Sequence, residues 1–335
     1  MKKTVRRIAA TAVASGIVAA GAVGLAGAAS ASPLSPASPA SAASPANSTS
    51  YSFQTLNNAS DPTFNQLLGI NDEGTIAGYF GSGMAGHPNK GYVLLPPYGQ
   101  RPYVNENFPG SVQTQVTGLN NRGVTVGFWS NTNKGSGDAN FGWIDIGGQF
   151  RQADFPTGDD ASPVVDQLLG VNDSDVAVGF WTDAQGNNHG YEFNALTGQF
   201  RSVVDPSDPG LGLTAAAIND SGDVAGVYTT AAGNTDGFLL THHGRHFTDL
   251  AVPGASSTMA LGVNNRDEVV GTYTDGSGSS ATMHGFTWTP WAGFTSIDDP
   301  HGMGTTTING VNDRGQLVGF YVDAAGNTDG FLATP

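Results

Sequence analysis

The sequence predicts an all-β fold, a six-bladed β-propeller of four-stranded blades over residues 51–335. Three observations predict it. One pattern of residues occurs six times along the chain, each copy contains four short segments typical of strands, and the last copy lacks a segment that stands alone before the first. A ring that joins the two ends accounts for all three.

The repeat is defined by four landmarks. An asparagine preceded by an aliphatic residue, with glycine usually before that, recurs every 45 to 52 residues. A glycine follows it after seven residues, and further on comes a glycine with an adjacent aromatic residue. Five copies then have an aromatic residue six positions before a proline, and the sixth copy lacks this landmark. The six asparagines are Asn71, Asn120, Asn172, Asn219, Asn264 and Asn312.

Each copy contains four short strand-like segments. In the first copy they read QLLGIN, TIAGYF, GYVLL and PYVNENF. They are rich in β-branched and aromatic residues, and residues typical of turns separate them. No segment shows a helical period over the length that a helix needs. The repeat therefore predicts one four-stranded sheet per copy.

The turn between the first two strands is the best specified. It runs from Asn71 to Gly74 in the first copy, and three other copies also have glycine at its fourth position. A tight hairpin of this length needs a positive φ there, which glycine adopts freely. Asp175 and Asp267 stand there in the other two copies, and aspartate is among the few residues that tolerate this conformation. We expect the asparagine to hydrogen-bond its own turn.

The two ends of the repeat region complement each other. Residues 51–60, YSFQTLNNAS, place Phe53 six residues before Ala59, where other copies have proline. This segment is interpreted as a fourth strand without the preceding three, whereas the last copy has three strands and no fourth. Joining them closes a ring and removes the exposed ends of an open array. A linear solenoid is the alternative, and it leaves the first segment unexplained.

The run GINDEGTIAGYF and its copies, followed by HGY, DGF or HGF, resembles the HAF-type extracellular repeats of secreted bacterial proteins. The resemblance covers nearly all of residues 51–335. The middle residue of the His-Ala-Phe signature is glycine here, and its histidine remains only at His189 and His284. The resemblance implies a secreted, propeller-like module, and it implies no catalytic residues.

The N-terminal residues are typical of an export signal. A basic start precedes an uncharged Ala/Gly-rich run, and residues 29–31, Ala-Ser-Ala, offer a small-residue cleavage site. We expect a signal peptide over residues 1–31; an uncleaved anchor is the alternative, because the run is long enough to cross a bilayer. Residues 32–50 are rich in Pro, Ser and Ala, which predicts an extended tether. A secreted bacterial protein without a membrane span after cleavage is expected.

Composition narrows the partners. The chain has no cysteine, which excludes disulfides, cysteine-based catalysis and thiolate metal sites. Removing the four basic residues of the signal changes the net charge from −15 to −19, with 9 basic residues against 28 acidic ones. A surface this acidic repels the phosphate backbone of nucleic acids, and we therefore expect no nucleic-acid partner. Cations, polysaccharides and cell-surface proteins remain as partners, and we expect a monomer.

One face of the predicted propeller is the better candidate for binding. The first-to-second and third-to-fourth turns lie on one face, here called the turn face. The second-to-third loops and the links between blades lie on the other, here called the loop face. The first turn has a constant length, whereas the second-to-third segment varies from 11 to 15 residues between its flanking glycines. Because variable loops on a rigid scaffold commonly carry function, we expect binding at the loop face.

An aromatic residue stands two positions after the strand-two glycine in every copy. Large rings between neighbouring blades are expected on packing grounds alone. A circle of aromatic rings near the rim of the loop face also suits stacking on sugars, with the two tryptophans best placed. The candidate ligand-binding residues are Phe80, Trp129, Trp181, Tyr228, Tyr273 and Tyr321.

Three loops rich in Asp, Asn and Gly suggest calcium, which prefers six to eight oxygen ligands. They read TDAQGNNHG, TDGSGSS and VDAAGNTDG. The same residues are favoured in any hairpin loop, and the spacing differs from the twelve-residue calcium loop. Ordinary turn chemistry therefore remains the alternative. The candidate calcium ligands are Asp183, Asp323, Asn327 and Asp329.

Two classes of function remain open, beside a secreted scaffold that binds no small ligand. One is a non-catalytic binding module for glycans or a cell-surface partner, working through the loop face. The other is a glycan-active hydrolase or lyase with acidic residues over the central channel. No motif singles out a carboxylate pair, and the serines and histidines show no recognisable catalytic arrangement. We expect the binding module, and two or three carboxylates from different blades converging in a pocket would instead favour the enzyme.

Overall fold

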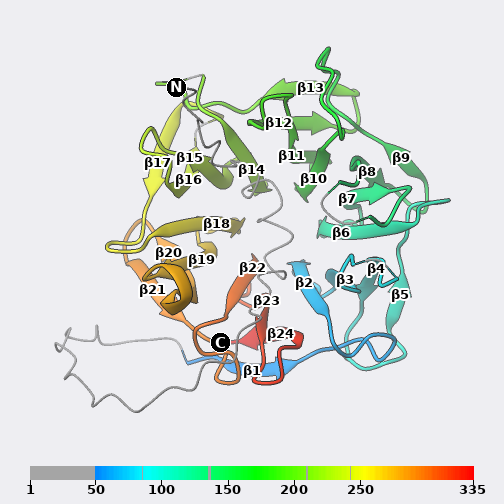
Figure 1. Ribbon diagram of the computed structural model, residues 1–335, viewed down its shortest axis with the longest axis vertical. Coiled ribbons are helices and arrows are strands. Elements are labelled where there is room, and N and C mark those ends of the chain that lie inside the picture. The colour runs from blue at the N-terminus through cyan, green and yellow to red at the C-terminus, as the bar shows by residue number, and fades with distance from the viewer. Residues whose placement is uncertain (1–49, 85, 135–136, 209, 242) are drawn as a thin grey trace, which may run out of the picture.

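The computed structural model describes residues 50–335 except 85, 135–136, 209 and 242. The predicted signal peptide and all of the predicted tether but Ser50 lie outside the described residues. Six four-stranded antiparallel sheets are arranged around one axis (Figure 1). The prediction of a six-bladed β-propeller is therefore confirmed, and the linear solenoid is wrong.

In blades 1 to 5 the chain runs from an innermost strand at the axis to an outermost strand at the rim (Figure 1). Blade 1 contains β2 (Asn65–Ile70), β3 (Ile76–Phe80), β4 (Lys90–Leu94) and β5 (Tyr103–Asn105). Blade 2 contains β6 (Gln113–Leu119), β7 (Thr125–Ser130), β8 (Phe141–Asp145) and β9 (Phe150–Gln152). Blade 3 contains β10 (Asp166–Val171), β11 (Val176–Thr182), β12 (Asn188–Asn194) and β13 (Gln199–Ser202).

The second half of the ring repeats this arrangement. Blade 4 contains β14 (Leu213–Ile218), β15 (Val224–Thr229), β16 (Thr235–Thr241) and β17 (His246–Leu250). Blade 5 contains β18 (Ser257–Val263), β19 (Val269–Asp275), β20 (Thr282–Thr289) and β21 (Gly293–Ile297), with a short 3-10 helix, η2 (Gly278–Ser280), before β20. Blade 6 contains β22 (Thr307–Val311), β23 (Leu317–Val322), β24 (Thr328–Thr334) and, from the start of the chain, β1 (Ser52–Thr55).

Blade 6 is built from both ends of the described chain. Strand β1 pairs with β24, and Phe53 lies opposite Ala333. The Phe53 ring packs on that of Phe331, with 5.6 Å between centroids. Pairing β1 with β24 covers the backbone groups that β24 would otherwise expose, which confirms the predicted closure of the ring.

Two sets of glycines bring the strands close together. Each innermost strand has a β-bulge, at Leu67–Gly69 in β2. Opposite the bulge lies the glycine seven residues after the motif asparagine, where an added Cβ would lie only 1.8 to 2.4 Å from a carbonyl oxygen of the bulged strand. At the axis, a Cβ on Gly118 would lie 3.0 Å from the Cα of Gly170 in the next blade. Close approach therefore explains the glycine two residues before the motif asparagine and the glycine seven residues after it.

The hydrophobic core lies between neighbouring blades. Between blades 2 and 3, for example, Val126 and Ile144 pack against Leu168 and Tyr191, and all four side chains are fully buried. Such contacts hold successive blades face to face around the ring. None of the described segments forms a helix long and apolar enough to cross a membrane.

Candidate functional site

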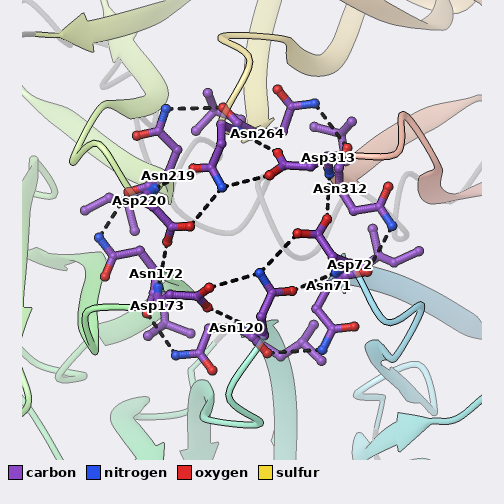
Figure 2. A pocket seen from close by; sticks show the side chains of 18 residues that line it. Asn71, Asp72, Asn120, Asn172, Asp173, Asn219, Asp220, Asn264, Asn312 and Asp313 are labelled. Carbon is purple, nitrogen blue, oxygen red and sulfur yellow. Dashed lines mark hydrogen bonds between the residues drawn. The ribbon is translucent and has the colours of Figure 1, made fainter.

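The six first turns converge on the axis at the turn face (Figure 2). Asn71 Oδ1 accepts the backbone N–H groups of Glu73 at 3.1 Å and Thr75 at 2.9 Å. Each of the other five asparagines accepts at least the N–H four residues further on. The fourth position of the turn has a positive φ, 83° at Gly74 and 56° at Asp175. Both predictions for this turn are confirmed.

The same asparagines also join the blades. Asn71 Nδ2 donates to the carbonyl oxygen of Asn120 in blade 2, and each later asparagine donates to its counterpart in the next blade. Asn312 in blade 6 donates to the carbonyl oxygen of Asn71 and completes the circle. The six N–O distances lie between 2.9 and 3.2 Å. This inner ring was not predicted, because it joins residues that lie about one repeat apart.

The residue after each asparagine forms a second ring. The backbone N–H of Asp72 donates to Asn121 Oδ1 at 2.8 Å, and the same bond recurs at 2.8 Å between every pair of neighbouring blades. Four members of this outer ring are aspartates and two are asparagines (Figure 2). In order, they are Asp72, Asn121, Asp173, Asp220, Asn265 and Asp313.

The two asparagines of the outer ring bridge their acidic neighbours. Asn121 Nδ2 donates to Asp72 Oδ2 at 3.2 Å and to Asp173 Oδ2 at 3.0 Å. Asn265 Nδ2 likewise donates to Asp220 and Asp313, at 2.8 and 2.9 Å. The ring thus consists of two Asp-Asn-Asp arcs. No amide stands between Asp173 and Asp220 or between Asp313 and Asp72.

The rings surround a depression of about 70 Å³ on the axis. A typical small-molecule pocket has about 300–1,000 Å³, so this depression is small by comparison. Each of the four carboxylates accepts a backbone N–H and a side-chain amide. The carboxylates therefore converge at the channel, but their hydrogen bonds join blades, and this arrangement suits a structural brace better than acid–base catalysis.

The six candidate ligand-binding aromatic residues lie at the loop ends of their blades. The Trp129 ring stacks on Phe108, in the link from blade 1, with 4.7 Å between centroids. Trp181 lies between Phe155, at 5.9 Å, and His189, at 4.3 Å. Five of the six side chains are partly exposed, and Tyr321 is buried. The six rings lie in six different blades, and each contacts its own set of neighbours.

The three tyrosines of this set share a hydrogen bond with the outermost strand of their own blade. Tyr228 Oη donates to Asp249 Oδ1 at 3.0 Å. The Tyr273 and Tyr321 hydroxyls lie 3.0 Å from the hydroxyls of Ser296 and Thr55, at the equivalent positions. Burial and the neighbouring Asp249 carboxylate raise the pKa of Tyr228, which keeps its hydroxyl a proton donor. These contacts span the third strand and stiffen the loop end of each blade.

The candidate calcium ligands lie in two different blades. Asp183 accepts the N–H groups of Gln185 and Asn187 in its own loop and pairs with His189 at 2.9 Å. These hydrogen bonds outweigh the opposing effect of desolvation and lower the pKa of Asp183 to about 2. Asp323 caps its loop in the same way through Ala325 and Asn327.

Asp329 lies on β24 and accepts Asn57 Nδ2 at 2.6 Å. Asn327 Nδ2 donates to Asp323 Oδ2. Among the described residues, no group of three or more His, Asp or Glu side chains is arranged to hold a metal ion. The four candidate ligands act here as loop caps and cross-links, and calcium remains a prediction.

No protein-family model and no curated protein matches the chain. Solved structures match it at low identity. AofleA from Arthrobotrys oligospora is 12% identical with a TM-score of 0.51, over 85% of this chain and 86% of that one. A streptogramin B lyase is 11% identical with a TM-score of 0.46, over 84% and 97%. A PL25 ulvan lyase bound to -[GlcA(1-4)Rha3S]- is 13% identical with a TM-score of 0.40, over 77% and 76%. At these identities the similarity concerns the fold alone.

Proposed function

We propose that residues 51–335 are a secreted binding module that recognises a glycan or a cell-surface partner through its loop face. The observation that carries this proposal is the set of aromatic rings at the loop ends of all six blades. Trp181 carries most weight, because its indole is partly exposed and its stacking on Phe155 and His189 holds it rigidly, with its edge open to a partner. A rigid aromatic side chain with an apolar body and a polar atom is enriched at binding surfaces, and its rigidity lowers the entropy cost of binding.

The turn face supports this proposal by contrast. Its axial carboxylates and amides are committed to bonds between blades, and its depression is small compared with typical ligand pockets. The loop face carries the loops of variable length, and five of the six aromatic side chains at the ends of those loops are partly exposed. The acidic chain favours neutral glycans over anionic ones, because like charges repel.

A glycan array probed with the mature protein, in calcium and again in EDTA, tests the proposal. We expect binding that Trp181→Ala weakens by at least about ten-fold, the effect of losing roughly 1.4 kcal/mol of stacking energy. Trp291→Ala is the matched control, since Trp291 is 73% exposed in a third-to-fourth turn on the opposite face. Binding lost in EDTA would support calcium at the acidic loops. No binding in either buffer would contradict the glycan proposal.

A second function, a glycan hydrolase or lyase, is favoured by one observation. Four aspartates from four blades do converge at the axis, as an acidic site over the channel requires. Release of reducing ends or unsaturated products from a panel of polysaccharides tests it. Activity abolished by Asp173→Asn, in a variant that melts as the wild type does, would replace the binding module by this enzyme.

A further inference from the structure

At the loop end of each blade, three residues lie side by side in a row across the sheet. The first is on the second strand, the second is on the third strand, and the third lies next to the end of the fourth strand. In blade 5, Tyr273 on β19 lies opposite His284 on β20. Gly285 lies opposite Ile297, so Asp298 continues the row next to His284. The corresponding rows are Phe80-Lys90-Asn107, Trp129-Phe141-Asp154, Trp181-His189-Val204, Tyr228-Asp236-Ala251 and Tyr321-Asp329-Asn57.

The third residue of the row has a structural role in four blades. Its Oδ1 accepts the N–H of the glycine next to the row on strand three, at 3.1 Å in blade 1, 2.8 Å in blade 2, 3.3 Å in blade 5 and 3.0 Å in blade 6. Asparagine and aspartate both serve, and blades 3 and 4 fold with valine and alanine there. The fold therefore uses only Oδ1 of Asp298, and its second oxygen is not required by the scaffold.

In blade 5 that second oxygen orients a histidine. His284 Nδ1 lies 2.7 Å from Asp298 Oδ2, and His284 Nε2 lies 2.9 Å from Thr282 Oγ1. An ionised carboxylate only accepts, so Nδ1 carries the proton and donates it. In the neutral ring Nε2 then has the lone pair and accepts the Thr282 hydroxyl proton. The Thr282 hydroxyl, the His284 base and the Asp298 carboxylate that orients this base are thus hydrogen-bonded one after another.

The histidine is held rigidly and the hydroxyl is open to solvent. The His284 ring stacks on Tyr273 with 5.3 Å between centroids, and Tyr273 is itself tied to Ser296. The His284 side chain is 23% exposed, and Thr282 is exposed on the loop face. Substrate therefore reaches the hydroxyl without a rearrangement of the blade.

Blade 5 alone combines these groups. The residue two positions before the row on strand three is threonine only here; the other blades have Pro88, Ala139, Asn187, Asn234 and Asn327. His189 is the other histidine at the row position, and its Nε2 pairs with Asp183 rather than with a hydroxyl. Since five blades fold without the arrangement, folding does not account for it.

We propose that Thr282, His284 and Asp298 form an acyl-transfer site that hydrolyses esters. Thr282 Oγ adds to the ester carbonyl while its proton passes to His284 Nε2. The bond from the acyl carbon to the alkoxy oxygen then breaks, and the leaving alcohol takes that proton. Water, deprotonated by the same Nε2, adds to the acyl carbon. The bond from that carbon to Thr282 Oγ then breaks, the acid leaves, and Thr282 Oγ takes the proton back from Nε2. If the loop face binds glycans as proposed above, the substrate class is O-acyl groups on sugars.

Hydrolysis of p-nitrophenyl acetate by the mature protein tests the site. We expect a rate above that of buffer, falling by about ten-fold or more in Thr282→Val and in His284→Gln, since general-base catalysis is commonly worth 10²–10⁴. Thr287→Val is the matched control on the same strand and should keep the wild-type rate. A fluorophosphonate probe should give a mass adduct that fragmentation places on Thr282.

Asp298 is a positioning residue, and its variant needs a separate measurement. Asp298→Asn keeps an oxygen for the Gly285 N–H but no longer holds the Nδ1 proton, so kcat should fall while KM stays constant. A folded wild type without hydrolysis above buffer, an adduct elsewhere, or full activity in Thr282→Val would overturn the proposal. Glycan binding, measured on the Thr282→Val variant, is independent of these outcomes, so the failure of either proposal is recognised separately.

Discussion

At the scale of single residues, the motif asparagine combines two roles that other side chains cannot combine. Its oxygen caps its own turn, and its amide nitrogen donates to the carbonyl of the next blade. Aspartate supplies only the first role, and serine or threonine is too short to span both. The same geometry recurs six times, which explains why the asparagine never varies along the chain.

Asn172→Ala removes both roles at a buried position. Three hydrogen bonds are lost, from Ser174, from Val176 and to Asn219. We expect the free energy of unfolding in urea to fall by about 2–3 kcal/mol. Asn187→Ala, at an exposed loop position, should change it by less than about 0.5 kcal/mol. Equal values for the two variants would contradict the role assigned to the ring.

Asp166 shows how one residue adds pH dependence to a structural position. The equivalent residues Thr114, Thr258 and Thr306 each accept the N–H of the residue before the linking proline or its equivalent. Asp166 does the same for Phe155 and also accepts the Tyr191 hydroxyl at 2.5 Å. Burial outweighs these hydrogen bonds and raises the pKa of Asp166 to about 8.

This raised pKa predicts that the wild type loses stability as pH rises. An unfolded aspartate loses its proton near pH 4, whereas the folded carboxyl keeps it up to about pH 8. Unfolding therefore releases a proton between these pH values, and the free energy of unfolding falls with each pH unit across this window. Asp166→Asn mimics the protonated carboxyl. We expect it to exceed the wild type in unfolding free energy at pH 8, by on the order of a few kcal/mol, and to match it near pH 4. Urea titrations at both pH values check this, and a difference independent of pH would refute it.

At the scale of elements, the innermost strand and its hairpin partner depend on glycine. The bulge in each innermost strand turns a carbonyl oxygen toward the second strand. In blade 3 this oxygen is the carbonyl oxygen of Gln167, and a Cβ added to Gly179 would lie only 1.9 Å from it. Steric room, and not a positive φ, is what this glycine provides, since its φ is not in the left-handed region.

Gly179→Ala should therefore displace β10 from β11. We expect a loss of about 3 kcal/mol or more in unfolding free energy, at the upper end for an overpacked site. Gly158→Ala is the control, because a Cβ there meets nothing within 4 Å. Calorimetric melts of both variants check the prediction, and an unchanged melting temperature for Gly179→Ala would show that the blade repacks around the methyl group.

At the scale of the whole molecule, closure is achieved twice. At the rim β1 joins β24, and at the axis the last turn donates to the first through Asn312 and Asp313. The axial closure collects four carboxylates, and the two bridging amides of Asn121 and Asn265 offset part of their repulsion. The free energy of unfolding should therefore depend on the salt concentration, through the repulsion between the axial carboxylates.

Asn265→Asp replaces one bridging amide by a fifth carboxylate. Two hydrogen bonds are lost and two pairs of adjacent aspartates become one run of five, so we expect a loss of about 1–2 kcal/mol at low salt. Added NaCl should restore part of it, because the Debye length shortens to about 8 Å at 0.15 M. Asn234→Asp adds the same charge at an exposed loop and should have little effect at either salt concentration.

Most of the fold could be predicted from the sequence, and little of the site. The segment around Phe53 predicts the closing strand correctly, and Asp175 and Asp267 predict the backbone conformation of their turns. The prediction for Asn71 was incomplete, because its turn cap is local whereas its bond to Asn120 depends on how neighbouring blades are placed. The approach of Asp298 to His284 likewise depends on a strand register that the residue pattern does not specify.

By itself, the sequence determined the number of blades, the strands in each blade and the closure of the ring. These follow from the period of a repeat whose strands must each bury one apolar set of side chains against the next blade. Only the tertiary structure decided which polar groups meet: the double ring at the axis, and the alignment of Thr282, His284 and Asp298 on one blade. The repeat gives every blade the same fold. A site specific to one blade arises where its residues differ from the other copies, and the surrounding structure sets the distances between their polar atoms.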